Sequence, residues 1–241
     1  MKKLVYTLGL ALLAGFTAKA QMGKRDFAGA MQIQVTYRQY DVGQLNSGLN
    51  SVGLPSVSDN NIWINASMSH IHKKWLFEDG IGFTPFSSSE VNNIKTRFNQ
   101  YQAYFRAGYD ISKSTDFRFY PFVGLNFSEA VLNIRDKARE QNVSNFNQEL
   151  LNSTSSKTLY QGNFGIELGA GFDYVIKMKP KQMDCYTVQR NIPIGIRAGY
   201  YINAARGDWR IEDYKLNNGP DKSQGAVFVS LNVGLGYAVK R

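Results

Sequence analysis

The residues whose types and spacing are best suited to catalysis are a serine and the only two histidines of the chain. They lie together in Ser69-His70-Ile71-His72. A serine beside a histidine is the arrangement of a nucleophile and its general base, and His-x-His supplies two ligands to a metal ion. No third metal ligand lies nearby in the sequence, so we predict no metal site and no cofactor.

A second group of candidates consists of charged residues spaced within apolar, alternating segments. In each segment they occupy the face opposite to the apolar one, where a charge needs a partner or water. The basic members outnumber the acidic ones, Glu167 and Asp173, and they are Arg38, Arg106, Arg118 and Arg197. We predict that Arg38, Arg106, Arg118, Glu167 and Arg197 form a polar network on one shared face.

The segments that would position these residues have a period of two. From Gln224 to Val239, apolar residues such as Val227 and Val229 alternate with small or polar ones such as Ser230. Alternation indicates a β-strand with two different faces. This run exceeds the length that a soluble sheet needs, whereas a tilted strand that crosses a bilayer needs about 9–11 residues in the hydrocarbon.

Seven more segments fit the same pattern, and long polar loops alternate with short turns between them. Long loops at one rim and short turns at the other are typical of outer-membrane barrels. We therefore predict an all-β fold, an eight-stranded antiparallel up-and-down transmembrane β-barrel. The other seven segments are about 29–40, 61–72, 75–86, 97–110, 116–132, 159–176 and 191–204, with long loops at about 41–60, 87–96, 133–158 and 205–223.

The third segment has an irregular pattern. Asp79 shares a face with Phe77, Ile81 and Phe83. Either a turn lies at Glu78-Asp79-Gly80, or a bulge shifts the register so that the aspartate leaves the apolar face.

The apolar faces also carry aromatic residues near both rims, as expected for side chains that anchor a barrel at the two membrane interfaces. Near the loop rim these are Tyr37, Tyr101, Phe127 and Tyr160, and near the turn rim they are Tyr109, Phe119, Tyr174 and Tyr237.

The start of the chain indicates export. Residues 1–20 contain an early Lys2-Lys3 pair, an apolar run and Ala18-Lys19-Ala20, which is the pattern of a cleaved signal peptide. We predict a single barrel domain over 21–241, located in the outer membrane. The formal charge of +9 is compatible with nucleic-acid binding, but export makes that function class unsuitable. The single cysteine, Cys185, leaves no partner for an internal disulfide.

The final segment resembles the last strand of the small, porin-like outer-membrane β-barrels of Gram-negative bacteria. Those barrels carry a C-terminal insertion signal of a polar residue, a glycine, an aromatic and an apolar residue at set spacing. Asn232, Gly234, Tyr237 and Val239 match it in order, although Lys240 and Arg241 follow where many members end on an aromatic. The resemblance implies that these residues are read by the barrel-assembly machinery, and that outer-membrane lipids surround the barrel.

Three functions remain open. The first is a non-enzymatic barrel, structural or narrowly porin-like, whose surface loops bind an unknown partner; its interior is either an ion-pair plug or an anion-selective pore. The second is an enzyme acting on outer-membrane lipid, as some related barrels are. We predict no catalytic residues. His70 and His72 continue the alternating positions that face outward, and they lie at the turn rim near the inner leaflet, whereas lipid A lies in the other leaflet. The third is a soluble lipocalin-like carrier, which requires the apolar face to point inward.

Overall fold

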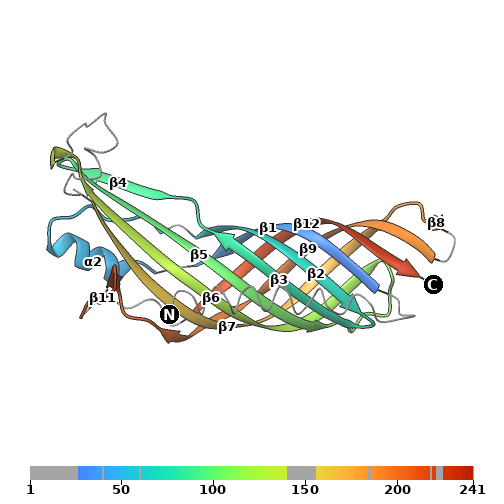
Figure 1. Cartoon of the computed structure of the whole chain (residues 1–241). Coiled ribbons are helices and arrows are strands. Elements are labelled where there is room, and N and C mark those ends of the chain that lie inside the picture. Colours follow the sequence, from blue (N-terminus) through green and yellow to red (C-terminus); the bar gives the residue numbers. More distant parts are fainter. Residues whose placement is uncertain are drawn as a thin grey trace.

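A computed structural model describes residues 27–39, 41–59, 61–139, 156–183, 186–217, 219–220 and 225–240. The predicted signal segment 1–20 lies outside these ranges. Eight long strands form a closed antiparallel barrel, in which each strand pairs with its neighbours and β1 pairs with β12 (Figure 1). They are β1 (Phe27–Arg38), β2 (Ile62–His72), β3 (Trp75–Phe83), β5 (Ile94–Tyr109), β6 (Phe117–Asp136), β7 (Ser156–Lys177), β9 (Tyr186–Arg206) and β12 (Gly225–Lys240).

The side chains alternate between the outside and the interior of this barrel. On β1, Met31 and Ile33 are 65% and 61% exposed, whereas Gln32 and Gln34 between them are 2% and 1% exposed. The apolar face therefore points outward and the polar face inward, as in a membrane-spanning barrel. This confirms the predicted fold class, and it is the reverse of the arrangement that a lipocalin-like carrier requires.

Strand β3 is regular, so both explanations offered for its irregular pattern are wrong. Its register against β2 and β5 is continuous from Trp75 to Phe83. The turn that precedes it lies at Lys73-Lys74, where Lys73 has a φ of 57°. Regular alternation sends Glu78 into the interior, where it is 1% exposed, and consequently sends Asp79 to the outer face.

Strands β5, β6 and β7 continue past the body of the barrel at the loop end (Figure 1). The segment predicted as a loop at 87–96 is instead a hairpin, in which β4 (Ser87–Val91) pairs with the first part of β5. Its turn residues Asn92 and Asn93 have φ of 50° and 64°, which asparagine tolerates and which suits a two-residue hairpin turn. The side chain of Lys137 donates hydrogen bonds of 2.7 and 2.6 Å to Glu90, and these lower the pKa of that exposed carboxyl.

An apolar cluster lies on the inner face of this extension, and we call it the apical cluster. Helix α2 (Gly43–Ser51), which lies in the first predicted loop, contributes Leu45 and Leu49 one turn apart. The remaining members are Val42, Val57, Phe98, Ala130, Leu132 and Trp209, and every member is at most 8% exposed. Within the described part of the chain, no helix has the length and apolarity needed to span a membrane.

Side-chain hydrogen bonds hold two of the loops around the apical cluster. Asn46 on α2 accepts from the backbone N–H of Val57 at 2.8 Å and donates to its carbonyl at 2.9 Å. Trp209 Nε1 donates to the Pro220 carbonyl at 3.0 Å. Two short strands, β10 (Arg210–Ile211) and β11 (Tyr214–Lys215), form a hairpin beside β7. The turn rim at the other end carries the three-residue strand β8 (Lys181–Met183) and both ends of the described chain (Figure 1).

The barrel wall depends on close contact between two facing glycines. Gly169 on β7 pairs with Gly199 on β9, and a Cβ added at Gly199 would overlap the backbone oxygen of Leu168 and approach Gly169 Cα to 2.8 Å. We predict that Gly199→Ala lowers the free energy of unfolding by about 1–3 kcal/mol through overpacking. Urea unfolding in lipid vesicles, followed by the heat-dependent shift on a denaturing gel, measures this.

Gly162→Ala is the matched control, because a Cβ at Gly162 has no neighbour within 4 Å. Equal destabilisation by the two variants would contradict the packing explanation and leave only a general effect of replacing a strand glycine.

Candidate functional site

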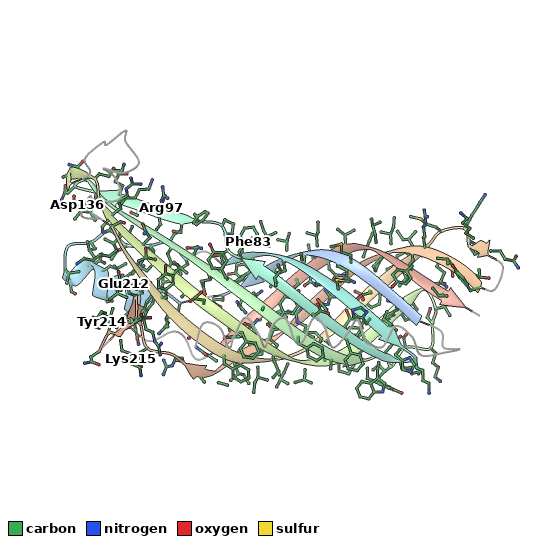
Figure 2. All side chains as sticks on the ribbon, viewed as in Figure 1. Phe83, Arg97, Asp136, Glu212, Tyr214 and Lys215 are labelled. Atoms are coloured by element: carbon green, nitrogen blue, oxygen red, sulfur yellow. The ribbon has the colours of Figure 1, made fainter. Side chains whose placement is uncertain are left out.

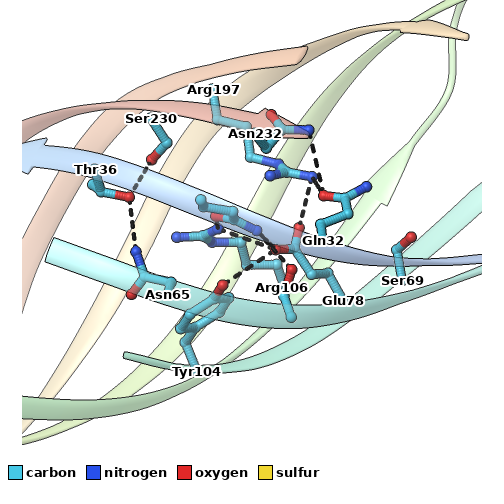
Figure 3. A network of polar contacts seen from close by, with 12 residues as sticks. Gln32, Thr36, Asn65, Ser69, Glu78, Tyr104, Arg106, Arg197, Ser230 and Asn232 are labelled. Atoms are coloured by element: carbon cyan, nitrogen blue, oxygen red, sulfur yellow. Dashed lines mark hydrogen bonds and ion pairs between the residues drawn. The ribbon is translucent and has the colours of Figure 1, made fainter. Parts of the chain in front are cut away.

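The interior of the barrel contains buried ion pairs between side chains of different strands. Arg106 Nε on β5 donates to Glu167 Oε2 on β7 at 2.7 Å. Arg197 Nη2 on β9 lies 3.2 Å from Glu78 Oε2 on β3, and Arg106 Nη1 lies 3.5 Å from Glu78 Oε1 (Figure 3). All four side chains are at most 4% exposed. Glu78 thus joins two arginines that come from different strands.

Arg38 joins these ion pairs at the loop side of the network. Its Nη1 lies 3.9 Å from Glu167 Oε1, and its Nη2 donates to Gln102 Oε1 at 3.0 Å. The guanidinium also lies over two aromatic rings, with its carbon 4.2 Å from the Trp63 ring centre and 4.7 Å from the Tyr201 ring centre. Aromatic faces attract cations, so these rings stabilise a charge that has little contact with water.

Asp173 occupies the turn side of the network. Its Oδ2 accepts from the Tyr120 hydroxyl at 3.0 Å, and its Oδ1 accepts from Asn232 Nδ2 at 3.2 Å. Arg197 Nε donates to the same Tyr120 hydroxyl at 3.1 Å. Asp173 is therefore connected to the arginines through the phenol of Tyr120.

Amide and hydroxyl side chains complete the network, and all eight barrel strands contribute to it. Gln34 donates to Glu78 and to Ser67, Gln32 accepts from Arg197 at 2.8 Å, and Asn126 donates to Glu167 at 2.8 Å. Thr36 contacts Ser230 at 2.7 Å across the β1–β12 closure (Figure 3). Each charged side chain of the network has at least one charged or polar partner, which offsets its removal from water, although the buried Arg197 Nη1 makes no hydrogen bond to the described residues.

The structure brings four of the five residues named from the sequence into this network, Arg38, Arg106, Glu167 and Arg197, and it adds an acid to them. Glu78 was missed, because the sequence left the register of β3 undecided. Arg118 points inward on β6 opposite Asp173 but is only half-buried near the turn rim, and the hydrogen bonds and ion pairs of the described residues do not connect it to the network. The network contains Arg38, Arg106 and Arg197 together with Glu78, Glu167 and Asp173, so its charges balance. When Arg118 outside the network is included, arginines still outnumber acids among these inward-facing residues, but by one and not by two as expected.

The serine and the histidines do not form a catalytic group. Ser69 points inward, is 2% exposed and donates to the Ala30 carbonyl at 3.3 Å. His70 and His72 belong to the outward-facing positions of β2, since neighbouring residues of a strand point to opposite sides. A nucleophile and a base on opposite sides of a barrel wall cannot exchange a proton. Among the described residues, no three His, Cys, Asp or Glu side chains group closely enough to hold a metal ion.

The four residues of the predicted insertion signal divide between the two faces of β12. Asn232 and Gly234 face the interior, where Asn232 donates to Asp173 and a Cβ at Gly234 would overlap Gln32 and the carbonyl of Met31. Tyr237 is 42% exposed on the outer face, and Val239 shares that face. The first two residues thus have a structural role in the barrel interior in addition to the role predicted for them.

Residues 8–184 match the family described as outer membrane protein beta-barrel domain. The chain belongs to this family. Membership places the barrel in the outer membrane, and the apolar outer face of the strands suits that location. No curated protein is significantly similar to the sequence.

Several solved outer-membrane barrels are similar to this chain at low sequence identity. A major outer membrane protein from Thermus thermophilus has 9% identity and a TM-score of 0.42, with 87% of this chain and 98% of that chain covered. Neisserial surface protein A (NspA) has 12% identity and a TM-score of 0.38, with 89% and 99% covered. The outer membrane protease OmpT from Escherichia coli has 9% identity and a TM-score of 0.32, with 90% and 98% covered. At this level of similarity no property of these proteins transfers to the chain.

Neutralising one acid of the network leaves buried arginines without compensation. We predict that Glu78→Gln lowers the free energy of unfolding by about 3 kcal/mol or more, as when one partner of a buried ion pair is removed. The measurement is the urea midpoint of the heat-modifiable band in lipid vesicles. Glu129→Gln is the control, since Glu129 is exposed on β6, and it should change stability by less than about 0.5 kcal/mol. Similar stability of the two variants would show that the network is not energetically important.

Proposed function

We propose that this protein is a non-enzymatic outer-membrane barrel with a closed interior. Its outer surface at the loop end, around α2 and the β10–β11 hairpin, would bind a partner, and we call this the loop-end surface. The observation that carries the proposal is the charge-balanced network of three arginines and three acids across the interior. Eight strands enclose a space that side chains can fill. A pore selective for anions needs an excess of positive charge in contact with water, and these guanidiniums are instead buried against carboxylates.

The apical cluster supports the same proposal at the loop end. Leu45 and Leu49 of α2 and Trp209 pack against inward-facing residues of β5 and β6. This packing fixes the loop segments on the extension beyond the barrel, whereas the ion network fills the interior of the barrel itself.

The outer surface of the same region supports a role in binding. Helix α2 and the β10–β11 hairpin lie together at this end (Figure 1), and Arg97, Asp136, Glu212, Tyr214 and Lys215 are found on it (Figure 2). Tyr214 is 73% exposed and Phe86, just before β4, is 72% exposed. Aromatic residues and arginine are enriched in protein-binding surfaces. We propose that the loop partner binds here.

A closed interior predicts no stable conductance in planar bilayers. The mature chain, incorporated from detergent, should produce no steady current steps at either polarity, because the ion network blocks the interior. An unboiled gel sample of the same detergent preparation is the control that proves folded barrels are present. Steady steps whose ion preference inverts in Arg118→Glu, a half-buried interior position outside the network, would overturn the proposal in favour of a pore.

We further propose that outer-membrane lipids surround the apolar face and that the barrel-assembly machinery reads Asn232, Gly234, Tyr237 and Val239. Tyr237→Ala should reduce the assembled, heat-modifiable fraction in outer membranes several-fold. Tyr109→Ala is the matched control, because Tyr109 and Tyr237 are 40% and 42% exposed and both lie on the outer face near the turn rim. Equal losses in the two variants would indicate interface anchoring alone and contradict the signal.

A further inference from the structure

Asp79 places an acidic side chain on the outer face of the barrel, halfway across the apolar band. It is the central residue of β3, which runs from Trp75 to Phe83. These two aromatic residues pair with Tyr109 and Tyr101 on β5, which belong to the two aromatic rims. Asp79 therefore lies at the same distance, in residues, from both rims.

His70 is the neighbour of Asp79 on this surface. Its Nε2 lies 3.9 Å from Asp79 Oδ1, and the two side chains remain 31% and 34% exposed. Between the aromatic rims, the other outward-facing positions of the described strands carry no acidic or basic side chain. The pair is thus an isolated polar site within an apolar surface.

A polar site at this depth is unfavourable against lipid. The hydrocarbon offers no hydrogen bonds, and ionisable side chains facing it are rare because they destabilise the folded barrel. About a third of each side chain is still accessible, so both groups remain partly exposed on the outer face. A protein surface that covers the pair and offers matching polar groups would remove this cost.

The site is complementary to itself in charge and in shape. A two-fold rotation about the membrane normal brings His70 of one copy opposite Asp79 of the other, in both directions at once. Beside the pair, Ile81 is 67% exposed and stands between its partners Ala66 and Ala103. A prominent isoleucine flanked by alanines lets each copy insert its Ile81 beside the small residues of the other.

We propose that the face formed by Met68, His70, Asp79 and Ile81 is the interface of a homodimer within the membrane. The occupant is a second copy of this chain, related by a two-fold axis along the membrane normal. This interface is separate from the loop-end surface around α2 and the β10–β11 hairpin. The dimer proposal does not depend on the proposed function.

Cysteine cross-linking in intact outer membranes tests the proposal. In a Cys185→Ser background, Met68→Cys on β2 is compared with Leu168→Cys on β7, on the opposite side of the barrel, where both native side chains are 49% exposed. A short bifunctional thiol reagent should give at least five-fold more product of twice the chain mass from Met68→Cys. Equal yields from the two positions, no product, or only a product of another mass would overturn the proposal.

Asp79→Leu in the Met68→Cys background separates the interface from a structural role within one barrel. It should lower the cross-linked fraction at least five-fold while the heat-dependent gel shift persists, because leucine suits a lipid-facing position. Unchanged cross-linking in a folded Asp79→Leu barrel would overturn the proposal. If that variant fails to fold, Met68→Cys against Leu168→Cys still decides the outcome.

Discussion

Charged side chains inside a narrow barrel must pair with one another, and this requirement explains much of the structure. Arg106 and Arg197 lie within ion-pair distance of acids on other strands of the barrel. Each pair requires that the strands carrying it keep one register, because a shift by one residue would turn the charge toward lipid. The ion pairs therefore form only when the strands keep their hydrogen-bond register, the barrel is closed and the polar side chains face the interior.

The same constraint explains the position of Asp79. Glu78 lies near two buried arginines, and a regular strand that directs Glu78 inward has to direct the next residue outward. The aspartate on the outer face is thus a consequence of strand geometry, whereas its histidine partner on β2 is an additional feature that geometry does not require. That combination is what makes the outer face near β2 and β3 a candidate interface.

The inward-facing side chains are polar in the barrel and apolar in the extension beyond it. In the membrane the interior is polar and the surface apolar, while in the extension the inner face of β5 and β6 carries the apical cluster. The same alternate positions of each strand face inward in both regions, and only the medium outside the strands differs. Above the membrane a polar outer surface contacts water, so an apolar interior becomes the favourable arrangement.

The sequence by itself determined the fold class, the number of barrel strands and the side of each strand that faces outward, since alternation with a period of two is a local property. It also placed Arg38, Arg106, Glu167 and Arg197 on the inner face. Only the tertiary structure decided which of these charges meet, because partners such as Arg106 and Glu167 are distant in sequence. The register of β3, the inward position of Glu78, the peripheral place of Arg118 and the hairpin at 87–96 likewise depend on pairing between strands. The helix α2 was not predicted, because its two leucines are buried only by packing against residues of β5 and β6, which are distant in sequence.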